Sequence, residues 1–284
     1  MTKNKFSTAG NRALQAAVAG LKKMSAPTTL PIHIQPIAIT RTVVKRNYAL
    51  ITPDGFVPSV LPGWKNVVVI INIAPVMGGP RFAQLQLTLD ETSSGHGNTG
   101  ALEHFYYVIS GNCTAQLNGK KNELAAGSYL FLPPKTDFKF SGATKGTRLL
   151  AFWKKFEPLA GQKIPGVLCG HADAIEGKPF LGNEDARLQV LLPDNLAFDL
   201  AVNIFTYQPE ATLPFVETHI MEHGLLMLQG QGVYLLDADY HPVTAGDVIW
   251  MASYCPQWFV ALGQKPASYI YYKDVNRAPG SGII

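Results

Sequence analysis

The amino-acid sequence predicts an all-β fold in which one sandwich or small barrel occurs twice in tandem. Three observations support this prediction: short apolar runs end at turn signals, helical periodicity is almost absent, and one stretch of the chain is repeated later. The 284 residues include 47% hydrophobic and only 15% charged side chains, which is typical of a globular chain with a sizeable core. No apolar run approaches the roughly 20 residues that a membrane span needs, so an integral membrane protein is not expected.

The N-terminal segment differs from the rest of the chain in charge. Residues 1–53 hold eight Lys or Arg and no acidic residue, whereas the remaining 231 residues carry 16 basic and 20 acidic side chains. Because a folded domain with this negative net charge has no broad phosphate-binding surface, nucleic acid is not expected as a partner. Residues 1–40 are predicted to form a flexible arm, and an organelle transit peptide is the open alternative. The three cysteines form no CxxC pair and no disulfide framework, which indicates a reducing, cytoplasmic location.

The repeat relates residue i of a first copy to residue i + 119 of a second copy without a gap. The matched positions include turn glycines, a Glu-His pair and a lysine near the end of each copy: Glu103-His104 with Glu222-His223, Gly111 with Gly230, Ala126-Gly127 with Ala245-Gly246, Phe140 with Phe259, and Lys154 with Lys273. We therefore predict a first barrel over residues 41–160 and a second over residues 161–284, joined within a Gly- and Pro-containing stretch.

Each copy is predicted to consist of short strands. Ahead of the first barrel, residues 41–60 are expected to add edge strands or to bridge to the other copy. The first copy has strands at residues 105–109, 114–117 and 129–132, and Asn118-Gly119 predicts a type I′ hairpin turn. The second copy has matching strands at residues 225–228 and 248–251.

The second copy carries a set of polar side chains typical of a metal site. Glu217 and His219 are separated by two positions, so on a strand both side chains leave the same face, and His223 follows after a short bend. Gln257 returns on a later strand. One carboxylate, two imidazoles and one amide oxygen suit a divalent ion such as Mn²⁺, Fe²⁺ or Zn²⁺. The alternatives are a polar strand edge that faces water and, for Gln257, an exposed turn after Pro256.

The first copy serves as an internal control. In the 119-residue register, the four positions of the second copy correspond to Asn98, Gly100, His104 and Phe138. Three of the four candidate ligands are therefore lost, and the first barrel is expected to hold no metal. His104 is expected to be a packed or hydrogen-bonded histidine.

These residues resemble the two cupin motifs, with Glu217, His219 and His223 at the usual ligand positions and Gln257 where the second motif ends in His. Glu at the front and Gln at the back are unusual among cupins. Together with three further motifs, they resemble the bicupin (S)-ureidoglycine aminohydrolase family: Tyr234 in GQGVY, residues 271–277 (YYKDVNR), and the segments NYALITPDG and YVISGN at residues 47–55 and 107–112. The resemblance extends from about residue 41 to residue 279.

The resemblance implies two tandem double-stranded β-helix (jelly-roll) barrels and the hydrolysis of (S)-ureidoglycine to (S)-ureidoglycolate and ammonia, in purine and allantoin catabolism. It also implies Mn²⁺ as the cofactor, a homo-oligomer, and the residue roles that follow. Glu217, His219, His223 and Gln257 would hold the ion, whereas Tyr234, Tyr269 and Lys273 would contact the substrate. Lys273 would supply positive charge as a catalytic group, and Glu217 is a candidate general base only if it leaves the ion during turnover.

The sequence also allows purely structural roles for the proposed substrate residues. Tyr234 and Tyr269 lie in strand-like runs where aromatic residues commonly fill a core. Lys154 occupies the position of Lys273 in the first copy, so both lysines could be structural. The other functions considered are a different metal-dependent bicupin enzyme, such as an oxygenase or isomerase, and a non-catalytic bicupin that binds a small molecule.

Overall fold

The computed structural model describes residues 40–274, and regular structure in this range is almost entirely β-strand. Its helices are single 3-10 turns: η3 (Pro53–Gly55), η4 (Pro75–Met77) and η5 (Ala172–Ala174). None of the helices in this range is long and apolar enough to cross a membrane. The described residues from Arg41 onward form one compact unit. The expected arm over residues 1–40 lies, except for Thr40, outside the described residues, as do residues 275–277 of the C-terminal motif.

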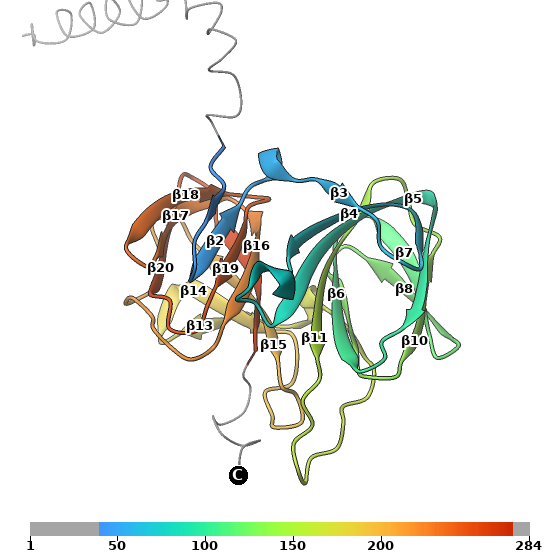
Figure 1. The fold of residues 1–284 in the computed structure, drawn as a ribbon. Helices are drawn as coiled ribbons and strands as arrows, with labels where there is room; N and C mark the ends of the chain where they lie inside the picture. The colour runs from blue at the N-terminus through green and yellow to red at the C-terminus, as the bar shows by residue number, and fades with distance from the viewer. Residues whose placement is uncertain (1–39, 275–284) are drawn as a thin grey trace, which may run out of the picture. The chain divides into compact units, whose positions relative to one another are not determined.

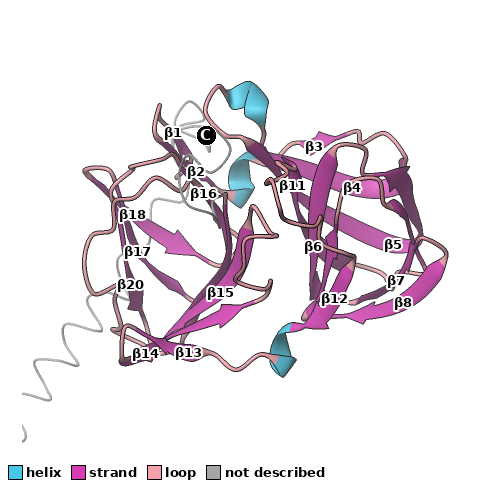
Figure 2. Ribbon diagram, turned by 90° about the horizontal axis from the view of Figure 1, so that it is seen from below, coloured by secondary structure: helices cyan, strands magenta, loops and turns pink. Residues whose placement is uncertain are grey.

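The first copy is built on one large antiparallel sheet that curls around its own core (Figures 1 and 2). Its strands, in chain order, are β3 (Pro58–Ser59), β4 (Trp64–Ile73), β5 (Phe82–Asn98), β6 (Leu102–Ser110), β7 (Asn112–Leu117), β8 (Lys120–Ala125), β9 (Ser128–Leu132), β10 (Asp137–Ser141) and β11 (Thr147–Lys155).

The second copy divides the same kind of barrel between an eight-stranded sheet and a three-stranded sheet. The larger sheet contains β13 (Lys178–Phe180), β14 (Asn183–Val190), β15 (Ala201–Tyr207), β16 (His223–Gln229), β19 (Val248–Met251) and β21 (Ala267–Lys273). The smaller sheet contains β17 (Gln231–Leu236), β18 (Asp239–Thr244) and β20 (Gln257–Leu262).

The predicted turns form where the sequence places them. Asn118 and Gly119 both have positive φ, at 46° and 84°, and join β7 to β8 as a two-residue hairpin loop. Gly111 and Gly230 also have positive φ, and a Cβ on either would lie within 2.7 Å of an atom on the neighbouring strand. Only glycine fits at these two positions, which explains why the turn glycines of the repeat coincide.

The two copies exchange strands. β2 (Tyr48–Ile51), which precedes the first copy in the chain, pairs with β19 of the second copy and holds β1 (Val43–Val44) at the sheet edge. Figure 1 shows this blue strand among the orange strands of the second copy. Conversely, β12 (Leu168–His171) follows the first copy and pairs with its β9. The expected bridge from residues 41–60 is therefore present. The predicted boundary at residue 160 divides the sequence into the two copies, but each copy's sheet also contains a strand from the other side of that boundary.

The core of this unit has three parts. One cluster fills the first barrel and a second cluster fills the second barrel. The third combines side chains from both copies, among them Phe82, Phe152 and Tyr272; the Phe82 and Tyr272 rings stack with centroids 4.1 Å apart. The barrels are thus joined by buried apolar surface as well as by exchanged strands.

The strand pairing corrects the gapless 119-residue register at two places. His223 lies opposite Lys273, whereas His104 lies opposite Trp153, so Trp153 and not Lys154 is the counterpart of Lys273. The second copy has one residue more between Phe259 and the start of β21 than the first copy has between Phe140 and the start of β11, and this extra residue shifts the last strand.

The second correction concerns Glu217. Its neighbour across the sheet is Gln257, while Phe138 lies opposite Gly97, so the counterpart of Glu217 is Gly97 and not Asn98. The expected pairing of His219 with Gly100 holds, because their carbonyls accept the backbone N–H groups of the equivalent residues Tyr254 and Lys135.

Candidate functional site

The second barrel encloses a cavity of about 250 Å³ between its two sheets. Its walls include all seven side chains that the sequence singles out: Glu217, His219, His223, Tyr234, Gln257, Tyr269 and Lys273. Apolar side chains such as Leu188, Phe205 and Met251 complete the lining. A few polar groups in a mostly apolar cavity are typical of a small-molecule site.

Glu217 and His219 lie in an irregular segment between β15 and β16, not on the regular strand that their spacing predicts. Glu217 is nevertheless held in strand-like fashion, because its N–H and C=O both bond to Gln257, at 2.8 and 3.0 Å. The His219 carbonyl accepts the N–H of Tyr254 at 2.7 Å. These three bonds fix the segment against β20 and the turn before it.

His223 and Gln257 begin their strands, β16 and β20. Gln257 is 4% exposed, so the exposed-turn alternative for this residue is wrong. His223 is 6% exposed and lies between Lys273 on β21 and Met251 on β19. Because both strands begin beside the cavity, the side chains of their first residues can both reach it.

The four side chains meet around His219. Its Nε2 atom lies 3.2 Å from His223 Nε2, 3.0 Å from the Gln257 amide and 3.9 Å from Glu217 Oε2. His223 Nδ1 lies 3.2 Å from the carbonyl oxygen of Tyr272, so an N–H there leaves Nε2 as the lone-pair atom. The alternative of a polar edge facing water does not describe this arrangement.

Burial sets the protonation of these groups. Desolvation lowers the pKa of His219, and burial followed by the nearby His219 lowers the pKa of His223 to about 3. Both imidazoles are therefore neutral at pH 7, as ligation requires. Burial raises the pKa of Glu217, and the positive charge of Lys273 opposes that shift.

The donor set fits a divalent ion by chemistry. Two neutral imidazoles, a carboxylate and an amide offer nitrogen and oxygen ligands of the kinds that Mn²⁺, Fe²⁺ and Zn²⁺ accept. Within residues 40–274, however, no three His, Cys, Asp or Glu side chains are arranged as a preformed ion site. The four side chains, Gln257 included, therefore match such an ion in the kinds of ligand atom that they offer.

Tyr234 and Tyr269 belong to a cluster of phenols behind these groups. The Tyr269 hydroxyl lies 3.1 Å from that of Tyr207, and the Tyr234 and Tyr269 ring centroids are 6.1 Å apart. Burial raises the pKa of both Tyr234 and Tyr269, so their hydroxyls stay protonated and can donate hydrogen bonds. Cys255, two residues from Gln257, is a buried core thiol whose pKa burial raises to about 11.

Asn203 on β15 is a polar residue of the cavity that the sequence pattern does not reveal. Its side chain is buried and donates from Nδ2 to the Tyr271 hydroxyl at 3.0 Å. Its Oδ1 atom is buried and has no hydrogen-bond partner among the described residues. The only sequence signal is a single Asn within an apolar strand, AVNIFTY, because polar residues inside such runs need a partner.

The equivalent region of the first copy is filled by aromatic rings. His104 stacks on Trp153 with centroids 4.4 Å apart, and its Nδ1 atom lies 3.2 Å from the Tyr106 hydroxyl. The Phe138 centroid is 5.7 Å away. Burial lowers the pKa of His104 to about 3. His104 is thus a packed, hydrogen-bonded histidine, as expected, and Trp153 and Phe138 stand where the second copy has Lys273 and Gln257.

No family model matches the sequence. Curated proteins do: (S)-ureidoglycine aminohydrolase of Arabidopsis thaliana is 36% identical over 261 residues, covering 90% of this chain and 86% of the plant protein. The (S)-ureidoglycine aminohydrolase of Escherichia coli (strain K12) is 37% identical over 249 residues, covering 86% of this chain and 94% of the bacterial protein. The chain belongs to the (S)-ureidoglycine aminohydrolase family.

Solved structures agree with this placement. The E. coli protein Ylba superposes with a TM-score of 0.75 at 34% identity, covering 85% of this chain and 97% of that protein. An oxalate decarboxylase superposes with a TM-score of 0.67 at 9% identity, covering 90% of this chain and 87% of that one, and this likeness concerns the fold alone. The predicted bicupin architecture is confirmed for this member of the (S)-ureidoglycine aminohydrolase family.

Proposed function

We propose that this chain hydrolyses (S)-ureidoglycine to (S)-ureidoglycolate and ammonia in the cavity of its second barrel. The observation that carries the proposal is the meeting of Glu217, His219, His223 and Gln257 in one cavity, within a chain whose curated relatives bear the name of this activity. The first barrel, whose corresponding region is filled with aromatic rings, supplies no ligand and no group that contacts the substrate.

Those four side chains are proposed to hold Mn²⁺. The neutral imidazoles and the half-buried carboxylate support this assignment, and availability in the cell would select Mn²⁺ over its competitors. When bound, such an ion orients the substrate, polarises it as a Lewis acid and lowers the pKa of a bound water.

The remaining polar groups of the cavity are proposed to bind and orient the substrate. Lys273, directly across the sheet from His223, supplies positive charge for the substrate carboxylate. The protonated hydroxyls of Tyr234 and Tyr269 donate hydrogen bonds, and the unpaired Asn203 Oδ1 atom accepts one from an N–H of the ureido or amine group. Asn203, Tyr269 and Lys273 lie on the neighbouring strands β15 and β21 and Tyr234 on the other sheet, and together they would hold one face of the reacting carbon toward the histidines.

The experiment that tests this function is ammonia release from (S)-ureidoglycine that is generated in situ from allantoate. The metal-stripped protein is assayed with and without Mn²⁺ beside the spontaneous reaction, and the stereochemistry of the product is determined. Mn²⁺-dependent release above the spontaneous rate, giving the S product, is the expected result. A folded, metal-loaded protein that gives no acceleration contradicts the proposal, and oxygen consumption in the same samples would then indicate an oxygenase.

Two broader properties belong to the same proposal. All three cysteines are free, which supports a reducing, cytoplasmic location. Apolar side chains on and beside β3 and β4 are exposed, among them Val60 at 92%, which supports a homo-oligomer. Sedimentation of the full chain measures its assembly state.

A further inference from the structure

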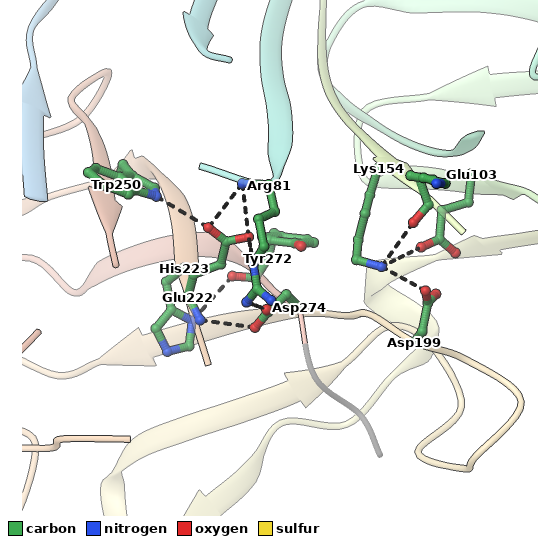
Figure 3. A network of polar contacts seen from close by, with 10 residues as sticks. Arg81, Glu103, Lys154, Asp199, Glu222, His223, Trp250, Tyr272 and Asp274 are labelled. Atoms are coloured by element: carbon green, nitrogen blue, oxygen red, sulfur yellow. Dashed lines mark hydrogen bonds and ion pairs between the residues drawn. The ribbon is translucent and has the colours of Figure 1, made fainter. Parts of the chain in front are cut away.

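A buried acidic pair in the second copy is neutralised by a cation from the first copy. Glu222 and Asp274 are 2% and 5% exposed, and Arg81, the residue before β5, forms ion pairs with both (Figure 3). The Arg81 backbone N–H also lies 3.2 Å from each carboxylate oxygen of Glu222. Asp274 in turn accepts the Glu222 N–H at 2.9 Å.

The first copy contains the related cluster with its charges redistributed. Lys154 on β11 lies 2.6 Å from Asp199 and 3.8 Å from Glu103 (Figure 3). The corrected strand register makes Glu103 the counterpart of Glu222. It also makes Lys154 the counterpart of Asp274, and Asp199 the counterpart of Arg81. Each cluster therefore has one cation and two carboxylates, and in each the other copy supplies one member: the carboxylate Asp199 beside Lys154, and the cation Arg81 beside Glu222 and Asp274.

The location of the Arg81 cluster connects it to the site. Glu222 immediately precedes His223, and Asp274 immediately follows Lys273, so Arg81 holds together the residues next to two groups of the cavity. Glu222 also ends the irregular segment that carries Glu217 and His219. The Lys154 cluster has no such neighbours, because His104 and Trp153 beside it are packed aromatic groups.

The contact between the copies continues along β5 beyond Arg81. A Cβ on Gly224, the residue after His223, would lie 2.3 Å from the Phe82 ring, so glycine at this position allows β5 to approach β16 closely. Gln84 donates to the Leu225 carbonyl at 3.1 Å in a buried setting. The start of β5 is thus packed along the back of the strand that begins with His223.

We infer that Arg81 is a positioning residue through which the first barrel sets the geometry of the site in the second barrel. It ties the ends of β16 and β21 together, and so fixes His223 relative to Lys273 and to the segment of Glu217 and His219. The inference rests on the proposed metal site, and it gives the barrel without ligands a role in the chemistry of its neighbour.

The test compares Arg81→Met with its matched control Lys154→Met in the full chain. Mn²⁺ affinity is measured by the electron paramagnetic resonance of the free ion, and unfolding midpoints establish that both variants are folded. Arg81→Met is expected to weaken Mn²⁺ binding about tenfold or more, as loss of outer-sphere support does elsewhere, whereas Lys154→Met keeps the wild-type affinity. Wild-type affinity in Arg81→Met, or an equal loss in both variants, would overturn the inference.

A charge exchange gives a second, independent test. Arg81→Asp places three carboxylates together, and the double variant Arg81→Asp/Asp274→Lys copies the arrangement of Lys154 and Asp199 in the first copy. The double variant is expected to recover most of the Mn²⁺ affinity that Arg81→Asp loses; no recovery would count against a positioning role. A wild-type protein that binds Mn²⁺ but releases no ammonia would contradict only the proposed reaction, whereas one that binds no Mn²⁺ would end both proposals.

Discussion

Gln257 at the start of β20 and Phe138 in the equivalent strand β10 occupy matching positions, and both side chains are buried. The amide lies beside His219, whereas the phenyl ring packs near His104. With Lys273 and Trp153 at a second pair of positions, two substitutions account for much of the difference between a polar cavity and a filled one. On the same backbone, the side chains at these two positions thus determine which barrel has a polar cavity that can bind a ligand.

The two histidines give the first test at this scale. His219→Ala and His223→Ala are each expected to lose bound metal and ammonia release while the protein stays folded, because both side chains border a cavity instead of filling a packed core. Metal analysis and thermal unfolding of the purified variants check both parts. If metal is retained in both variants, the assigned site is wrong.

Asn203 gives a test of substrate binding. Asn203→Ala removes the unpaired Oδ1 acceptor and is expected to lower kcat/KM about tenfold or more without changing metal content, since a lost hydrogen bond to substrate costs about 1–3 kcal/mol. Tyr271→Phe is the control, because it removes the hydroxyl that Asn203 contacts but keeps Oδ1. A larger loss in Tyr271→Phe than in Asn203→Ala would argue against this role.

At the scale of strands and turns, the sequence predicts what local chemistry decides. Asn118-Gly119 can form only a few turn types, and Gly111 and Gly230 mark turns with no room for a side chain. The apolar runs around residues 129–132 and 248–251 are buried strands as expected. Local propensity and the period of the pattern are sufficient for these elements.

Long-range pairing is not encoded in such local signals. One extra residue between Phe259 and β21 moves Lys273 onto the position of Trp153, and an uninterrupted alignment cannot detect that shift. Glu222 is adjacent to a predicted ligand, but its partner Arg81 is 141 residues away in the chain. Asn203 lies in an ordinary apolar strand, so its place in the cavity becomes visible only when the barrel is closed.

The core of the first barrel supplies a prediction at the scale of elements. Phe138→Ala is expected to lower the free energy of unfolding by about 3 kcal/mol, because the ring packs against Trp64, Tyr106 and Phe140. Metal content should not change. Urea denaturation beside metal analysis measures both, and a loss of metal at unchanged stability would contradict a structural role for this position.

At the scale of the molecule, the exchange of β2 and β12 makes each barrel depend on a segment that belongs to the other along the chain. Arg41 reinforces one exchange with two hydrogen bonds to the buried Asp247, at 2.6 and 2.8 Å. The shared aromatic cluster and the Arg81 contacts join the same two bodies. A barrel without ligands is therefore retained as part of the structure that supports the other.

This arrangement predicts cooperative unfolding. Calorimetry of the full chain is expected to show one transition for residues 41–274, with calorimetric and van't Hoff enthalpies in agreement, because neither barrel keeps its complete sheet when the other unfolds. Two well-separated transitions would show that the barrels are independent domains.

The most direct test of the account is a titration of metal-stripped protein with Mn²⁺ while ammonia release from (S)-ureidoglycine is followed. One occupied site in the second barrel predicts that release rises linearly and reaches its plateau at one Mn²⁺ per chain. A plateau at two ions per chain, or full release before any ion is added, would contradict the assignment of the chemistry to the second barrel alone.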